Sequence, residues 1–135
     1  MTRWIVAYVA ALPVFVAGDI SWLTLTGPRL YRPVIGALMA DKPDLRAAAA
    51  FYLLYVLGVT VLAIAPGLRA GRSLVALGWG AVAGLFAYGT YDLTNQATLK
   101  VWSTGVTVVD MAWGAAITGL AAFAGCLAAR AVHKG

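Results

Sequence analysis

Long hydrophobic runs alternate with short polar segments along this chain. The runs predict helices over about residues 4–25, 47–65, 73–94 and 105–130, and their only charged residues are Asp19, Asp92, Asp110 and, at the end of the last run, Arg130. At 1.5 Å per residue, each run is long enough to cross a hydrocarbon layer of roughly 30 Å. Helices are expected because lipid leaves unpaired backbone groups unsatisfied. The pattern therefore predicts four transmembrane helices.

The connections between these runs differ in length. Residues 66–72 form a short Pro/Gly/Arg segment that makes the second and third helices antiparallel neighbours. In the longer first connection, Gly27 and Pro28 are expected to break the helix, and the apolar residues 34–40 predict a short interfacial or partly re-entrant helix. We therefore predict an all-α, polytopic membrane protein. Residues 1–135 would form a single integral membrane domain, an antiparallel four-transmembrane-helix bundle.

Composition supports a membrane location. The chain is 62% hydrophobic with a mean hydropathy of +0.85, whereas soluble domains are about 45–50% apolar. The net charge of +5 suits contact with anionic headgroups, so membrane lipids are the expected partners. No nucleic-acid partner is expected, because no soluble basic domain is present to bind one.

The first run also has features of a signal peptide, since Arg3 precedes it and residues 16–18 are small. The apolar pattern resumes over residues 22–25, which favours a retained helix. Four helices place both termini on the same side of the membrane.

Orientation follows from charge only in part. Either side would carry five Lys or Arg residues, so the positive-inside rule does not decide. The short loop with Arg69 and Arg72 and the basic tail with Lys134 slightly favour cytoplasmic termini.

The topology brings three of the five aspartates toward one membrane face. Asp19 lies about 9 Å inside the end of the first helix and Asp110 about 7 Å inside the start of the fourth, whereas Asp92 lies near a boundary that water reaches. A carboxylate at a helix centre costs about 2.5–3.5 kcal/mol. We therefore expect these groups to face the bundle interior or a wet cavity, with Lys100 of the short third loop as the preferred counter-ion.

Aromatic and polar residues share this level and helix faces with the aspartates. Together they predict a binding site formed by Asp19, Trp22, Tyr52, Tyr55, Tyr88, Tyr91, Asp92, Asn95, Lys100, Trp102, Asp110 and Trp113. Two structural interpretations remain open. The tryptophans and Tyr91 could form an interfacial aromatic belt, and Asp92 with Lys100 could form an ion pair that closes a loop.

The remaining residues limit the chemistry. The only cysteine, Cys126, excludes an internal disulfide, and the only histidine, His133, is expected at the face opposite the aspartates. A Ser-His-Asp triad and a haem or di-iron histidine site are therefore not expected, no metal site is predicted, and no cofactor is implied. Small residues four apart predict close packing inside the bundle or, alternatively, a homodimer: Gly80 and Gly84, Ala115 and Gly119, Ala121 and Gly125.

Four strings carry a family resemblance: YGTYDLTNQATLKVW at 88–102, DMAWG at 110–114, DISWL at 19–23 and FYLLY at 51–55. With them the chain resembles the bacterial membrane-protein family known as domain of unknown function 2177. The resemblance implies a small four-helix protein of the bacterial inner (cytoplasmic) membrane, and it implies no activity. The family's motif residues fall here on Asp19, Trp22, Tyr88, Tyr91, Asp92, Leu93, Thr94, Asn95, Thr98, Lys100, Trp102, Asp110, Trp113 and Gly114. Ser103 stands where the family pattern has proline.

Two functional classes fit these observations. The pocket could bind or transport a lipid-like or small amphiphilic ligand. Alternatively, the protein could be a membrane-embedded enzyme acting on a lipid or its headgroup. Its catalytic candidates are Asp19, Asp92 and Asp110 as acid or base, with Lys100 holding an anionic group and a tyrosine, Tyr88 or Tyr91, as donor. A role as an assembly subunit of a larger membrane complex is a third hypothesis.

Overall fold

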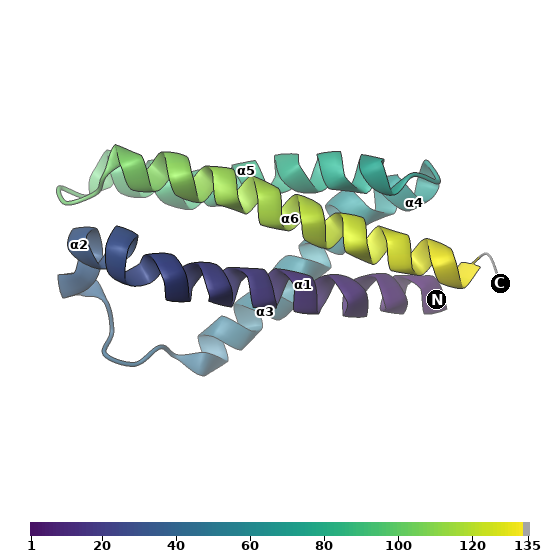
Figure 1. Cartoon of the computed structure of the whole chain (residues 1–135), viewed down its shortest axis with the longest axis horizontal. Helices are drawn as coiled ribbons and strands as arrows, with labels where there is room; N and C mark the ends of the chain where they lie inside the picture. Colours follow the sequence, from purple (N-terminus) through teal and green to yellow (C-terminus); the bar gives the residue numbers. More distant parts are fainter. Residues whose placement is uncertain (134–135) are drawn as a thin grey trace.

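Helices account for almost all of the described residues (Figure 1). The computed structural model describes residues 1–133, so Lys134 of the predicted basic tail lies outside the described residues. In chain order the elements are α1 (Thr2–Thr26), the π-helical turn η1 (Gly27–Tyr31), α2 (Arg32–Ile35), the 3-10 turn η2 (Gly36–Leu38), α3 (Leu45–Val59), the π-helical turn η3 (Thr60–Ile64), α4 (Ala65–Arg69), α5 (Ser73–Thr98) and α6 (Thr104–His133).

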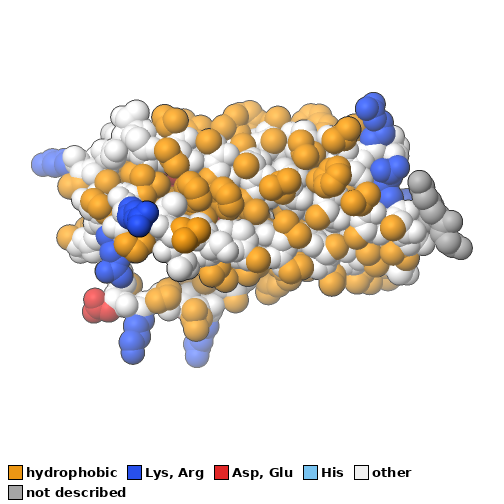
Figure 2. Space-filling view, in the orientation of Figure 1, with side chains coloured by type: hydrophobic (Ala, Val, Ile, Leu, Met, Phe, Trp, Pro, Cys, Tyr) orange, Lys and Arg blue, Asp and Glu red, His pale blue; other side chains and the backbone are white. Residues whose placement is uncertain are grey.

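These elements form four continuous helical stretches that are long and apolar enough to cross a membrane: Thr2–Leu38, Leu45–Arg69, Ser73–Thr98 and Thr104–Val132. They run antiparallel, and the N-terminus and the end of α6 lie at the same end of the molecule (Figure 1). On the face shown in Figure 2, hydrophobic side chains cover the middle, and Lys and Arg gather at the two ends. The prediction of an all-α, four-helix, multi-pass membrane protein is confirmed.

The expected break at Gly27 and Pro28 is wrong. The helix continues through η1, where the Gly27 N–H donates to the Leu23 carbonyl, and Pro28 stands at the start of the turn. A π turn bonds residue i to residue i+5 and therefore accommodates a wider backbone path. The first connection is thus a helical extension of α1 that reaches Leu38. Asp44 then caps α3 by accepting from the Arg46 and Ala47 N–H groups at 2.9 and 3.2 Å.

Pro66 does not end the second helix either. It lies in the first turn of α4, which continues α3 through η3 as far as Arg69. The Thr60 hydroxyl donates to the Val56 carbonyl at 2.8 Å beside this π turn. The turn before α5 is therefore shorter than predicted, and Gly71 forms it with a φ of 64°, a left-handed conformation that glycine adopts without strain.

Close helix packing depends on small residues. A Cβ atom on Gly84 would lie 2.2 Å from the Gly114 carbonyl oxygen, and one on Gly125 would lie 2.6 Å from the Ala7 carbonyl oxygen. The backbones of α5, α6 and α1 therefore approach one another closely within one chain, which uses the small-residue faces that the sequence also offered for a homodimer.

α3 packs along only part of its length. Its buried residues are Val56 and Val59, near its C-terminal end. Toward its N-terminal end it diverges from α1 (Figure 1). This divergence opens the bundle at the end that carries the first connection.

Candidate functional site

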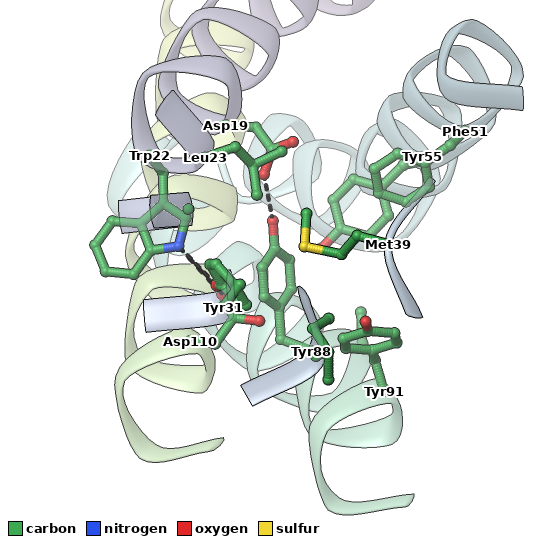
Figure 3. A pocket seen from close by; sticks show the side chains of 13 residues that line it. Asp19, Trp22, Leu23, Tyr31, Met39, Phe51, Tyr55, Tyr88, Tyr91 and Asp110 are labelled. Atoms are coloured by element: carbon green, nitrogen blue, oxygen red, sulfur yellow. Dashed lines mark hydrogen bonds between the residues drawn. The ribbon is translucent and has the colours of Figure 1, made fainter. Parts of the chain in front are cut away.

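A cavity of about 500 Å³ lies where α3 diverges, between α1 with its helical extension, α5 and α6. Figure 3 shows polar and aromatic side chains converging on it from these elements. Its lining residues are Asp19, Trp22, Leu23, Gly27, Tyr31, Ile35, Met39, Phe51, Tyr55, Ala87, Tyr88, Tyr91 and Asp110. The walls are therefore mostly apolar and aromatic, with two carboxyl groups among them.

Asp19 connects three helices at one side of the cavity. Its side chain, in a residue only 8% exposed, accepts from the Tyr52 hydroxyl of α3 at 2.8 Å and from the Tyr88 hydroxyl of α5 at 3.1 Å. Figure 3 shows the Tyr88 ring directed toward Asp19. Each carboxylate oxygen therefore has one phenol donor, which offsets the cost of burying it.

Asp110 of α6 holds the first connection in place. Its Oδ1 atom accepts from the Trp22 indole N–H at 3.2 Å and from the Tyr31 hydroxyl, and the same indole N–H lies 2.9 Å from the Tyr31 oxygen. Asp110 and Tyr31 are 5% and 7% exposed. These bonds fasten η1 to α6 and close the cavity on that side (Figure 3).

Substituting Asp110 by alanine is expected to release residues 27–38, because Trp22 and Tyr31 then lose their shared acceptor. Loss of a buried hydrogen bond costs about 1–3 kcal/mol, so amide hydrogen exchange in this segment should accelerate roughly 5- to 150-fold. Asp41→Ala, at an exposed aspartate of the same connection, is the control and should leave the exchange rates unchanged. Equal exchange in Asp110→Ala and wild type would show that Tyr31 is not the anchor.

Asp92 differs from the other two carboxyls. It is fully buried beside Asp110, does not line the cavity, and has no hydrogen-bond donor to either oxygen among the described residues. The prediction that it lies at a wet boundary is wrong, because α5 continues past it to Thr98.

Lys100 is not the counter-ion that the sequence suggested. It is exposed in the loop after α5, whereas the hydrogen-bond partners of Asp19 and Asp110 are phenols and an indole. Among the residues that the structure describes, no lysine or arginine lines the cavity. The structure therefore does not contain the loop-closing Asp92–Lys100 pair.

The predicted binding residues separate into two groups. Asp19, Trp22, Tyr55, Tyr88, Tyr91 and Asp110 line the cavity, whereas Tyr52, Asp92, Asn95, Lys100, Trp102 and Trp113 do not. Of the second group, Tyr52 still contacts the site through Asp19, and Trp113 stacks on Trp22 with ring centroids 4.7 Å apart.

The aromatic belt interpretation fits only some residues. Trp22 and Trp113 stack between α1 and α6. Tyr91 is 52% exposed and contacts the Trp102 ring edge-on at 5.7 Å, and the Trp102 indole donates to the Thr107 hydroxyl at 2.9 Å. Of these four residues only Tyr91 has the exposure expected of an interfacial belt, since Trp22, Trp102 and Trp113 are all half-buried.

Several lining residues were missed in the sequence. Tyr31, Ile35 and Met39 come from the first connection, for which the sequence predicts a short interfacial or partly re-entrant segment but no part in the site. The signal that could have found them is the apolar character of residues 34–40, since such a segment needs a surface to cover.

The arrangement suits ligand binding. It has carboxylate and phenol oxygens as hydrogen-bonding groups and apolar walls for a larger body. A carboxyl group that contacts the cavity could also exchange a proton with a bound molecule. Among the side chains that the structure describes, those of residues 1–132, no three His, Cys, Asp or Glu residues lie close enough together to hold a metal ion.

Comparison with known proteins places the chain in one family. No curated protein and no solved structure matches it significantly. The model of one family, described as "Predicted membrane protein (DUF2177)", matches residues 4–127, which confirms the resemblance seen in the sequence motifs. This small multi-pass membrane protein therefore belongs to the DUF2177 family.

Proposed function

We propose that the protein binds a lipid-like or small amphiphilic molecule that enters its cavity from within the membrane. The observation that carries this proposal is the cavity of about 500 Å³, which places the carboxyls of Asp19 and Asp110 among apolar and aromatic walls. Ligand pockets commonly measure about 300–1,000 Å³ and combine apolar walls with a few polar groups. An amphiphile matches both parts of this lining.

A route from the membrane supports the proposal. A second hollow of about 380 Å³ lies between α3 and α5 and is lined by Phe51, Leu54, Tyr55, Gly58, Val59, Leu62, Ala83 and Ala87. It shares Phe51, Tyr55 and Ala87 with the cavity. We refer to this second hollow as the α3/α5 groove. Leu54 and Leu62 are 71% and 62% exposed on the lipid-facing side, so an apolar chain could lie in the groove while its polar end occupies the cavity.

Binding accounts for the site better than lipid-modifying catalysis does. The enzyme hypothesis assigns Lys100 to hold an anionic group, and Lys100 lies exposed outside the cavity lining. Asp92, another catalytic candidate, also lies outside this lining. The cavity therefore contains carboxyl and phenol groups that can hold a ligand, but it lacks Lys100, the anion-binding group of the enzyme hypothesis.

Substituting Ala87 by tryptophan tests the proposal. Ala87 lines both the cavity and the groove, so a large side chain there should fill the junction between them. We expect about tenfold less co-purified amphiphile per protein, equivalent to a loss of about 1.4 kcal/mol of binding free energy. Extraction in mild detergent followed by mass spectrometry of bound small molecules measures this amount.

Leu85→Trp is the matched control. Leu85 is an exposed residue of the same helix and lines neither hollow, so its substitution should leave the co-purified species unchanged. If Ala87→Trp and Leu85→Trp carry the same amount of ligand as wild type, the cavity is not a binding site.

A further inference from the structure

We propose that the polar end of the bound molecule is a protonated amine attached directly to an apolar chain or ring, and that it binds between Asp19 and Asp110. This inference rests on the proposed function and specifies its ligand class. Three properties of the site support it: the charges of the lining residues, the free hydrogen-bonding capacity of the two carboxyls, and the change from a polar cavity to an apolar groove.

Charge is the first argument. The cavity contains two carboxyl groups, Asp19 and Asp110, and neither the cavity nor the α3/α5 groove is lined by a lysine or arginine. An anionic headgroup would face both carboxyls without a cation to hold it. Complementary charge favours a cation in this place.

Hydrogen-bonding capacity is the second argument. The phenols of Tyr52 and Tyr88 donate to Asp19, while Trp22 and Tyr31 both donate to Oδ1 of Asp110. A carboxylate accepts about four hydrogen bonds, so each group keeps free acceptor capacity after these protein donors are used. An ammonium group has three N–H donors and no acceptor, which complements this surplus.

Asp92 adds a further carboxyl group beside Asp110 in the interior of the bundle. It lies beside Asp110 with 0% exposure, and among the side chains of residues 1–132 only the neighbouring Asp110 carboxyl is placed to share a hydrogen bond with it. A cation held at Asp110 would lower the electrostatic cost of this second carboxyl group directly behind it.

The aromatic side chains of the cavity support the same ligand class. The rings that line it are Trp22, Tyr31, Phe51, Tyr55, Tyr88 and Tyr91. Ammonium groups bind to the faces of such rings through cation–π attraction, which strengthens when water is excluded. Figure 3 shows these rings arriving from several helices around the carboxyls.

The position of the groove indicates how the amine is attached. The cavity passes into the apolar groove at Phe51, Tyr55 and Ala87, and no basic residue lines this junction. An aminophospholipid would place its anionic phosphate between the ammonium group and the acyl chains, and therefore at this junction. A lipophilic amine has no phosphate, so its ammonium group can lie in the cavity beside the carboxyls while its apolar part passes directly into the groove.

Binding of matched probes to the full chain in nanodiscs of uncharged net lipid composition tests the inference. The probes are dodecylamine, dodecanol, laurate and a lysophosphatidylethanolamine with a twelve-carbon chain, with empty nanodiscs as background. We expect dodecylamine to bind about tenfold or more tightly than each of the others, a difference of about 1.4 kcal/mol in binding free energy. Ala87→Trp should weaken the binding of dodecylamine and dodecanol alike, because both need the junction.

Asp110→Asn is the decisive variant. An asparagine carbonyl in place of Oδ1 retains the acceptor for Trp22 and Tyr31, so the fold should persist, as unchanged hydrogen exchange in residues 27–38 would show. The variant should lose most of the preference for dodecylamine over dodecanol. Asp41→Asn, at an exposed aspartate, controls for surface charge and should keep the preference.

Other outcomes separate the two proposals. Equal affinity for dodecylamine and dodecanol, both sensitive to Ala87→Trp, would overturn the amine inference and leave amphiphile binding intact. Tightest binding of lysophosphatidylethanolamine would overturn direct attachment and identify an aminophospholipid headgroup as the source of the amine. Failure of every probe to bind above empty nanodiscs would overturn the proposed function as well.

Discussion

Replacing Gly84 by alanine is expected to destabilise the packing of α5 against α6 by about 3 kcal/mol or more. The added Cβ atom would lie 2.2 Å from the Gly114 carbonyl oxygen, 2.7 Å from the Thr118 hydroxyl oxygen and 2.8 Å from the Gly114 carbonyl carbon. Two of these atoms belong to the backbone of α6 and cannot rotate away. The two helices would have to separate, which would also expose the core between them.

Gly78→Ala is the matched control on the same helix. A Cβ atom at Gly78 has no neighbour within 4 Å, so the substitution should be neutral or stabilise by up to about 1 kcal/mol through higher helix propensity. Reversible unfolding of both variants in mixed micelles, followed by circular dichroism, measures the difference. Equal stability of the two variants would show that α5 and α6 do not pack through Gly84.

The same packing determines the geometry of the cavity. A Cβ atom on Gly114 would lie 2.2 Å from Cγ of Tyr88, so the Tyr88 ring lies directly on the backbone of α6. The hydroxyl of this ring donates to Asp19 across the cavity. Small residues between α5 and α6 thus position a phenol whose bond connects α5 to α1.

Part of this site can be predicted from the sequence, because the hydrophobic runs and the topology they imply are enough to bring two of its aspartates together. Antiparallel connections between four spans place the end of the first helix and the start of the fourth at one membrane face. This reasoning predicts that Asp19 and Asp110 converge, and both line the same cavity in the structure. Their partners were harder to predict. Lys100 was favoured because it lies in the short loop that joins the helices of Asp92 and Asp110, whereas phenols and an indole from other helices reach Asp19 and Asp110.

The two π turns lay beyond sequence reasoning. Gly27 with Pro28 and the isolated Pro66 are typical helix breakers, yet η1 and η3 carry the helix past both positions. The Tyr31–Asp110 hydrogen bond made from η1 joins residues far apart in the sequence, so no local pattern contains it. Tyr31 was therefore assigned to a connection, although it forms part of the cavity wall.

Asp92 was misplaced for a related reason. Its neighbours Leu93 to Thr98 are mixed in polarity, which suggests the end of a membrane span, but α5 extends through them. The aspartate therefore lies inside the bundle, where its exposure is 0%. Asp19 and Asp92 are therefore both buried but differ in their surroundings, since Asp19 has two phenol donors and Asp92 has none among the described residues.

Alanine at these two positions should therefore have different consequences. Asp19→Ala leaves the hydroxyls of Tyr52 and Tyr88 without their acceptor, and each unsatisfied donor costs about 1–3 kcal/mol. Because both tyrosines are only partly buried, we expect the free energy of unfolding to fall by about 2–4 kcal/mol. Asp92→Ala should stay within about 1 kcal/mol of wild type, because the packing lost with a small carboxyl is offset by relief of its desolvation.

Unfolding of both variants under identical micelle conditions compares them directly. Since the substitution is the same at both sites, differences in side-chain volume and helix propensity cancel, and the remaining contrast reports the two phenol bonds. A large loss in Asp92→Ala would reveal a stabilising partner for that carboxyl, and an unchanged stability in Asp19→Ala would show that Tyr52 and Tyr88 do not depend on Asp19. The expected contrast assigns Asp19 to the support of the cavity and leaves Asp92 without a role in stability.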